Sequence, residues 1–286
     1  MVSQGDQGDP SLHRRKLRLE LRRAREISAL TQREAAEMLD WSLSKIIRIE
    51  TGTVSVSVTD LRALLQLYKV QDPNLVTPLE QAARGSKGNS WWSAYSDVIV
   101  PQFGTYLGYE GAATSIHTYH PIVIPGHLQT QDYSMALLLP RVDELRATRL
   151  VDLRIARQER LFSSNSCTEK TFIIDEAALR RQIGGDSVMR HQMLELAEKG
   201  ALSDVKIYIY PLNAGAHYSS LGSFILLGFP DDGDLLYLEH ATGSMTGGED
   251  LELLARYQEC FESILEKSLD EESSMSLIRQ LSSKQG

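Results

Sequence analysis

The sequence predicts two domains: an N-terminal all-α domain, followed by a larger α+β domain with a mainly antiparallel sheet. Three observations support this prediction. The chain has 286 residues, more than one hydrophobic core usually serves. Apolar residues recur at helical spacing up to about residue 70. Beyond residue 90, short runs rich in Ile, Tyr, Phe and Val appear, and the last three follow one another without a helical pattern between them.

The N-terminal domain begins after residues 1–11, a Gly- and Asp-rich segment that we expect to be disordered. Leu17, Leu21 and Ala24 fall at i, i+4 and i+7, which predicts a helix over residues 12–29. Three further helices follow within forty residues. We therefore expect the domain to span residues 12–72.

Local signals mark where these helices begin and end. Thr31 and Glu34 form a capping box at the start of the second helix, and Ser42 caps the third. Gly52 is expected to end the third helix, and the fourth runs near residues 60–68.

The rest of the chain divides into three parts by composition. Residues 73–90 are expected to form a linker that is partly helical, residues 91–268 the α+β domain, and residues 269–286 a mobile tail. Strands are predicted over 171–174, 205–210, 223–227 and 235–239, and helices over 142–162, 176–182, 187–199 and 249–268.

Charge separates the two ends of this acidic chain, whose net charge is −8. Residues 1–70 carry 12 Lys and Arg against 9 Asp and Glu, whereas the remaining residues carry 18 against 29. Eight of the basic residues lie within 14–33. Such a basic end either binds a polyanion or forms a solvated helix face.

Composition also excludes several classes of protein. Cys167 and Cys260 lie far apart, which excludes a disulfide framework and a cysteine zinc site. No run of about 18 apolar residues occurs, and the first thirty residues are polar and then basic. We expect a cytoplasmic protein that contacts no membrane.

The second and third helices are separated by a turn of three to four residues, which is typical of a helix-turn-helix. Ile46 and Ile49 would then point into the domain core. The opposite stripe is available to the major groove of double-stranded DNA, where Arg48 would read guanine and the aliphatic side chains would meet thymine methyl groups. The residues predicted to face the bases are Leu43, Ser44, Ile47 and Arg48.

Phosphate contacts are predicted beside this stripe. Thr31 and Gln32 lie at a helix N-terminus, where free amides and the helix dipole favour an anion. Lys45 lies at the edge of the stripe and is expected to bind phosphate.

The segment over residues 15–70 resembles the lambda-repressor-like helix-turn-helix of the xenobiotic-response-element family. The resemblance rests on LR-x2-R at 21–25, TQ-x-E-x-A at 31–36 and S-x-S-x-I-x-R-I-E-x-G at 42–52. It implies that Arg25 and Glu50 form a structural ion pair. Ile47 departs from the family pattern, in which many members carry a small polar residue.

Residues 91–270 resemble a domain of unknown function in actinobacterial regulators that are described as antitoxin-like or WhiJ-like. The resemblance implies transcriptional regulation and often a small partner protein. One block usually reads PGLLQT, and here His127 replaces the first leucine. The matching blocks are WWSAY at 91–95, HPIVIPGHLQTQDY at 120–133, RIARQERL at 154–161, IYPLNAGAH at 209–217 and SFILLGF at 223–229.

Two groups of residues in this domain are candidates for a partner or ligand surface. Gln129 and Tyr133 follow the Pro–Gly turn at helical spacing and indicate either a structural turn or a ligand contact. Arg154 and Arg157 recur at i and i+3 on one helix, which indicates a solvated face, pairing with the acidic excess of this domain, or a docking surface.

Signals of catalysis are weak. A metal site formed by His117, His120 and His127 with Glu110 is disfavoured, because the first two histidines lie in a β-prone segment where they would point to opposite faces. The glycine-rich segment over 243–248 contains neither a Walker lysine nor a GxGxxG motif. We expect no cofactor, no metal and no enzymatic activity.

The sequence therefore predicts a DNA-binding transcriptional regulator whose C-terminal domain forms a homodimer and senses a partner protein or a ligand. Two alternatives stay open. One is an antitoxin-like protein that mainly neutralises a small partner protein. The other is a small-molecule sensor with a pocket between sheet and helices.

Overall fold

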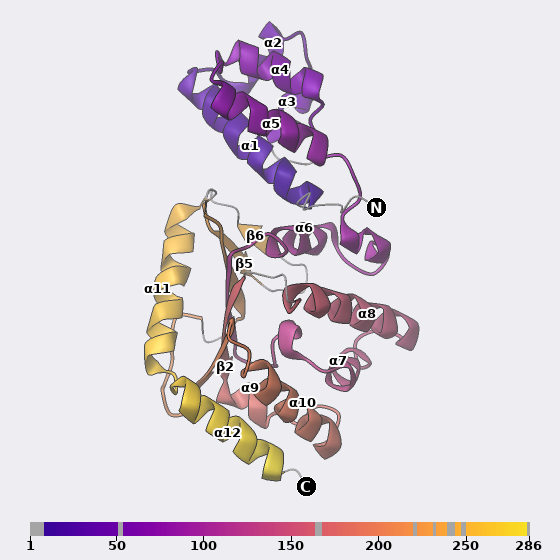
Figure 1. Cartoon of the computed structure of the whole chain (residues 1–286), viewed down its shortest axis with the longest axis vertical. Helices are drawn as coiled ribbons and strands as arrows, with labels where there is room; N and C mark the ends of the chain where they lie inside the picture. The colour runs from indigo at the N-terminus through magenta and orange to yellow at the C-terminus, as the bar shows by residue number, and fades with distance from the viewer. Residues whose placement is uncertain are drawn as a thin grey trace. The chain divides into compact units, whose positions relative to one another are not determined.

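The computed structural model describes residues 9–50, 54–163, 168–219, 222–230, 233–238, 244–246 and 250–284. The chain forms two compact units, residues 1–93 and 94–286 (Figure 1). Among the residues named above, Gly52, Cys167 and the glycines at 243, 247 and 248 lie outside the described part of the chain.

The N-terminal unit is a bundle of helices around one apolar core. Leu17, Leu21, Ile46, Leu61 and Leu64 are buried together at its centre, as helical spacing predicts for these positions. The helices of this unit are α1 (Pro10–Ile27), α2 (Gln32–Met38), α3 (Leu43–Glu50), α4 (Val58–Leu67) and α5 (Pro73–Gly85).

Helix α5 is the helical part of the segment over residues 73–90 that we expected to be a partly helical linker, and it packs as a member of the N-terminal unit. Asp72 caps the helix through its side chain, and Pro73 occupies the first turn, where a missing amide hydrogen costs nothing. Leu79, Ala82 and Ala83 are buried in the domain core. Their i, i+3 and i+4 spacing makes an apolar face that packs beside α1 and α4.

The C-terminal unit is built on a six-stranded mixed sheet with the strand order β3-β2-β1-β4-β5-β6. The prediction of a mainly antiparallel sheet was wrong in this respect, because β1, β2 and β3 run parallel. Helices connect these three strands, whereas β4, β5 and β6 pair antiparallel. The strands are β1 (Ser115–His120), β2 (Glu169–Asp175), β3 (Val205–Tyr210), β4 (Phe224–Gly228), β5 (Leu235–Leu238) and β6 (Ser244–Thr246).

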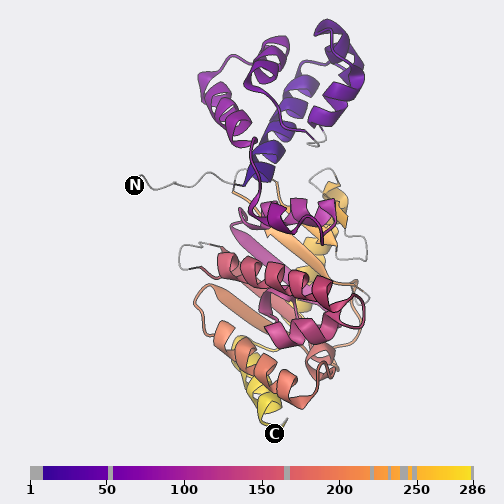
Figure 2. The same cartoon turned by 90° about the vertical axis from the view of Figure 1, so that its right-hand side faces the viewer.

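Helices cover both faces of this sheet. Helix α11 lies along one face, and α6, α7, α8 and α10 cover the other (Figures 1 and 2). The helical elements are η1 (Trp91–Tyr95), α6 (Pro101–Glu110), η2 (Gly126–Leu128), α7 (Gln131–Leu138), α8 (Glu144–Leu161), α9 (Glu176–Arg180), α10 (Asp186–Lys199), α11 (Leu251–Lys267) and α12 (Glu271–Lys284).

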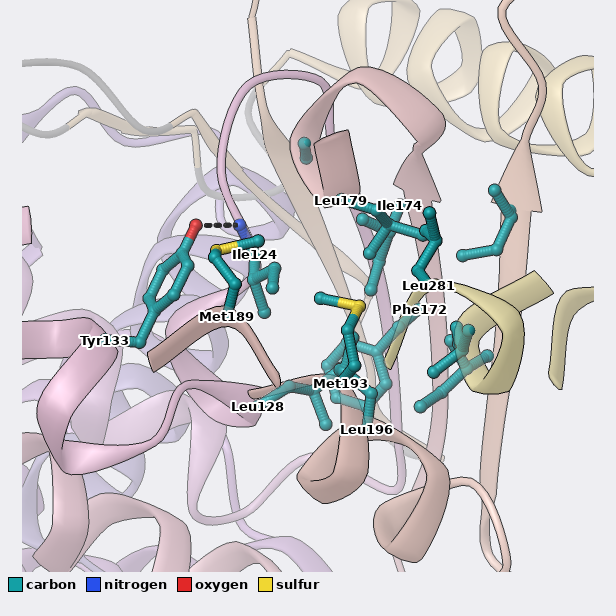
Figure 3. Packing of buried hydrophobic residues seen from close by; sticks show 14 of the residues in the cluster. Ile124, Leu128, Tyr133, Phe172, Ile174, Leu179, Met189, Met193, Leu196 and Leu281 are labelled. Atoms are coloured by element: carbon teal, nitrogen blue, oxygen red, sulfur yellow. Dashed lines mark hydrogen bonds between the residues drawn. The ribbon is translucent and has the colours of Figure 1, made fainter. Parts of the chain in front are cut away.

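Alternation along β2 divides the apolar residues between two cores. Phe172 and Ile174 pack with Met189 and Met193 of α10 (Figure 3). Ile173 points to the opposite face and belongs to the core beneath α11. A strand segment that is buried on both faces is apolar at consecutive positions, and Phe172, Ile173 and Ile174 in the middle of β2 form such a run.

Helix α12 occupies most of the segment that we expected to be a mobile tail. Ile278 and Leu281 are buried in the core with α10 and β3. Ser274 is also buried; its hydroxyl donates to the carbonyl of Leu269 at 3.1 Å and accepts the backbone N–H of Ile209 at 3.0 Å. The expectation relied on the Ser- and Glu-rich composition and overlooked the widely spaced apolar positions.

No described helix is long and apolar enough to span a bilayer.

The docking of α12 predicts a measurable contribution to stability. We expect Ile278→Ala to lower the free energy of unfolding by about 2–5 kcal/mol, because it leaves a cavity in a closed core. Denaturant unfolding followed by circular dichroism measures this change. Gln280→Ala, at an exposed position of the same helix, is the control, and an equally small effect of both variants would mean that α12 is not docked.

Candidate functional site

A sharp turn sets the angle between α2 and α3. Asp40 adopts a left-handed conformation with φ = 53°, which ends α2. The N–H of Trp41 donates to the carbonyl of Ala36 at 2.9 Å and closes the turn. At the start of α2, the capping box of Thr31 and Glu34 is present, as the sequence predicts. Together these features form the helix-turn-helix.

The outer face of α3 presents three of the four side chains that we predicted to face bases. Ser44, Ile47 and Arg48 are exposed, whereas Ile46 and Ile49 on the opposite face are buried. Ile47 keeps 39% of its surface exposed, which is high for an isoleucine.

Leu43 occupies a different position from the other three. It is partly buried and packs against the core of the N-terminal unit. An apolar contact of Leu43 with DNA would accordingly be limited to the part of the side chain that remains accessible.

The predicted phosphate ligands all make contacts inside the domain. Lys45 Nζ donates to Asp60 at 2.7 Å and lies 3.5 Å from the centre of the Trp41 ring. The hydroxyl of Thr31 is bonded to Glu34. To reach a phosphate, Lys45 would have to break its ion pair with Asp60 or contact the phosphate and Asp60 at the same time.

Arg25 and Glu50 form the ion pair that the family resemblance implied. Arg25 Nε and Nη2 donate to the two carboxylate oxygens of Glu50 at 2.6 and 3.0 Å. Gln32 Nε2 donates to the same carboxylate at 2.9 Å, so this predicted phosphate ligand instead supports the ion pair. The hydrogen-bonded carboxylate raises the pKa of Arg25 above its ordinary value. The end of α3 is thereby tied to both α1 and α2.

A second charged centre is buried in the C-terminal unit, between α6 and α8. Arg157 donates from Nε and Nη2 to Glu110 at 2.6 and 2.5 Å, and from Nη2 to the hydroxyl of Tyr106 at 2.8 Å. The Nε2 atom of His127 lies 2.6 Å from Glu110 and 2.6 Å from Arg157. The hydroxyl of Tyr106 donates to Glu110. We call these four residues the buried charged cluster.

The cluster keeps its carboxylate ionised despite its burial. Burial alone would raise the pKa of Glu110, but Arg157 and His127 outweigh it, and the pKa lies well below its ordinary value of 4.5. Burial raises the pKa of Tyr106 well above its ordinary value, so its hydroxyl remains a donor. Arg157 is buried within this cluster and pairs with an acidic residue, which is one of the roles considered for it from the sequence; it does not lie on a solvated face.

The loop after β1, which carries the PGHLQT block, is fixed by glutamine side chains. Gln129 Nε2 donates to the carbonyl of Ile124 at 2.6 Å. Gln158 donates to the carbonyls of Gly126 and Gln129 at 2.8 and 2.9 Å, and Gln192 donates to the carbonyl of Leu128 at 2.7 Å. Buried carbonyls in an irregular segment need such partners, which explains why this loop is ordered around polar side chains.

Tyr133 and Arg154 complete the set of residues that the sequence singled out in this domain. Tyr133 is fully buried, and its hydroxyl accepts the N–H of Ile124 at 3.3 Å (Figure 3). Tyr133 is thus a structural residue of the turn. Arg154 Nη1 donates to Gln129 and to the hydroxyl of Ser134.

A cavity of about 460 Å³ lies between α6, the loop after β1, α7 and α8. Gln129, Arg154 and Arg157 all line it, so the fold brings together three of the four residues predicted for a ligand surface. Arg141 and His120 line it as well. We call this space the arginine cavity.

The histidines considered for a metal site are separated by the fold. His117 stacks on Phe261 of α11, with ring centres 4.8 Å apart, whereas His120 lines the arginine cavity on the other side of the sheet. Alternation along β1 explains this separation. Glu110 and His127 do meet, but both also contact Arg157. No group of three metal-ligating side chains occurs in the described ranges.

Comparison with known families gives the class of each unit. A profile described as a helix-turn-helix domain matches residues 16–79, which makes the N-terminal unit a member of a DNA-binding class. A second profile, described as a domain of unknown function (DUF5753), matches residues 103–280. Because this match spans more than half of the chain, the protein belongs to the DUF5753 family. No curated protein and no solved structure gives a significant match.

The buried ion pair of the N-terminal unit supports a prediction. We expect Glu50→Gln to lower the stability of this unit by about 3–5 kcal/mol, because Arg25 would lose its charged partner at a largely buried position. Hydrogen exchange of the α3 amides measures the change locally. Glu37→Gln serves as the control, since Glu37 lies at an exposed position of α2. Equal protection in both variants would contradict the role of the pair.

The buried charged cluster predicts a dependence of stability on pH. Because the pKa of Glu110 is lowered in the folded state, its contribution is complete above the ordinary value of 4.5 and is lost as the pH falls towards the folded-state value. Glu110→Gln should therefore destabilise the C-terminal unit at pH 7, and its difference from the wild type should shrink below pH 4.5. Hydrogen exchange of the β2 amides over this pH range tests this, with Glu159→Gln on the exposed face of α8 as control.

Proposed function

We propose that this protein is a sequence-specific DNA-binding transcriptional regulator of the xenobiotic-response-element type. The observation that most directly supports this proposal is the division of α3 into two faces. Ser44, Ile47 and Arg48 are exposed on one face, and Ile46 and Ile49 are buried on the other. A recognition helix needs this division, because one face must pack on its own domain while the other enters the major groove.

Each exposed side chain has a contact that its chemistry supports. The guanidinium of Arg48 can donate two hydrogen bonds to guanine, and Ile47 can meet a thymine methyl group. Ser44 can bond to either kind of base edge. The ion pair of Arg25 and Glu50 holds α3 at a set angle, so that these three side chains are presented together.

We further propose that the C-terminal unit forms a homodimer and senses a partner protein or a ligand. A single small domain covers few base pairs, whereas two copies would read half-sites about one helical turn, or a multiple of it, apart. The acidic excess beyond residue 70 would keep the rest of the protein away from phosphate. This function places the protein in the cytoplasm and requires no catalysis.

Genome-wide footprinting of the intact protein and of Arg48→Ala tests the proposal. The wild type should protect paired half-sites, and the variant should lose about 1–3 kcal/mol at the best site and relax its preference at one base pair. Arg84→Ala, which removes an exposed charge from α5, is the matched control and should keep the sequence preference. A wild-type map without preferred sites would contradict the proposal, and a uniform loss in Arg48→Ala would make Arg48 a phosphate ligand.

A second candidate function is antitoxin-like neutralisation of a small partner protein. Leu139 and Leu145 favour it, because they flank the turn between α7 and α8 and keep 47% and 77% of their surfaces exposed. If this were the main function, Arg48→Ala would rescue a deletion strain as well as the wild type does.

A further inference from the structure

We propose that the arginine cavity binds a small organic carboxylate with an apolar body. This inference deepens the sensing part of the proposed function, since it names the class of ligand. It stands on the lining of the cavity and on the position of its charges.

The cavity lining is cationic. Arg141, Arg154 and Arg157 line it, and no described lining residue is acidic. Glu110 lies behind Arg157 and offsets its charge, while Arg154 lies partly buried on α8 and Arg141 is exposed on the segment that follows α7. A concave, partly desolvated site with this charge favours an anion, because the same charges act more strongly out of bulk water.

Gly126 lies beside two guanidinium groups in the wall of the cavity. A Cβ atom at this position would lie 3.5 Å from Nε of Arg154 and 3.7 Å from Nη1 of Arg157. Glycine places no side chain beside either group. A planar carboxylate fits a guanidinium through two parallel hydrogen bonds.

The remaining walls select an apolar body. Phe103, Ile124, Leu137, Leu150 and Leu153 line the cavity from α6, the loop after β1, α7 and α8. Its volume of about 460 Å³ lies within the range of sites for small molecules. A single carboxylate also suits such walls better than a phosphate, which carries more charge and costs more to desolvate.

Ligand binding would change the hydrogen bonds that hold the loop after β1. Arg154 Nη1 now donates to Gln129 and to Ser134, and Gln129 in turn holds the carbonyl of Ile124. A carboxylate that takes over donors of Arg154 would change the bonding of Gln129. The cavity is thus connected to the segment that joins β1 to α7.

Calorimetric titration of the full chain in the absence of DNA tests the proposal. The probes are octanoate and 4-phenylbutyrate, with 1-octanol as the uncharged match and inorganic phosphate as an anion without an apolar body. We expect the carboxylates to bind with a Kd of about 1 mM or lower, and octanol and phosphate to bind at least about tenfold more weakly. Failure of both carboxylates to bind, or equal binding by octanol or by phosphate, would overturn the proposal.

Variants locate the binding. Arg154→Gln should weaken octanoate binding about tenfold or more, whereas Arg146→Gln, at an exposed position of α8 outside the cavity, should leave it unchanged. Leu150→Trp should abolish binding by filling the cavity, and it decides the matter if Arg154→Gln fails to fold. Wild-type affinity in a folded Arg154→Gln or Leu150→Trp protein would overturn the proposal.

The Arg48→Ala variant separates this inference from the DNA-binding proposal. Arg48→Ala should bind octanoate as the wild type does, because α3 belongs to the other unit. Failure of DNA binding with intact carboxylate binding would therefore contradict only the proposed function, and the reverse result would contradict only the ligand site.

Discussion

A buried carboxylate must be met by a guanidinium, and this requirement organises both units of the chain. In the N-terminal unit Glu50 is held by Arg25, and in the C-terminal unit Glu110 is held by Arg157. Removing a charge of this kind from water costs several kcal/mol unless its partners are close and well oriented. In each case the pair joins elements that are distant in sequence, so that satisfying the charge also fixes how the helices pack.

The two pairs serve different purposes. Glu50 sits at the end of α3 and also accepts a bond from Gln32, which sets the angle of the exposed stripe relative to the domain. Glu110 anchors Arg157 at one wall of the arginine cavity and draws His127 of the PGHLQT block into the same centre. One pair supports the exposed stripe of α3, and the other supports one wall of the arginine cavity, whose volume of about 460 Å³ suits a small molecule.

Local signals in the sequence predicted the local structure well. The capping box at Thr31 and Glu34 needs only neighbouring residues, and the strand over 205–210 agrees with β3. The ion pair of Arg25 and Glu50 came from a family resemblance, since nothing local joins residues so far apart. Helix α5 and helix α12 were underestimated, because their compositions resemble linkers and tails while their few apolar residues fall on one face.

The charged cluster and the parallel pairing of β1, β2 and β3 were beyond local reasoning. Glu110 and His127 were considered together only as weak metal ligands, and Arg157 was expected at most to pair with the acidic excess in general, not with Glu110 in particular. Their meeting depends on how α6 and α8 pack against the sheet, which periodicity does not encode. The departure of His127 from the leucine that the family resemblance led us to expect was an available signal, since it places a polar ring at this position.

The position of α12 also bears on how the sheet avoids association with other chains. Strand β3 is an edge of the sheet, where unpaired backbone groups could template pairing with a second molecule. The segment that leads into α12 occupies that edge: Leu269 donates to the carbonyl of Ile209, and Ser274 accepts the N–H of the same residue. A chain shortened before this segment would leave the backbone groups of the edge strand β3 unpaired and exposed. Its first defect would be aggregation in solution rather than a loss of ligand or DNA binding.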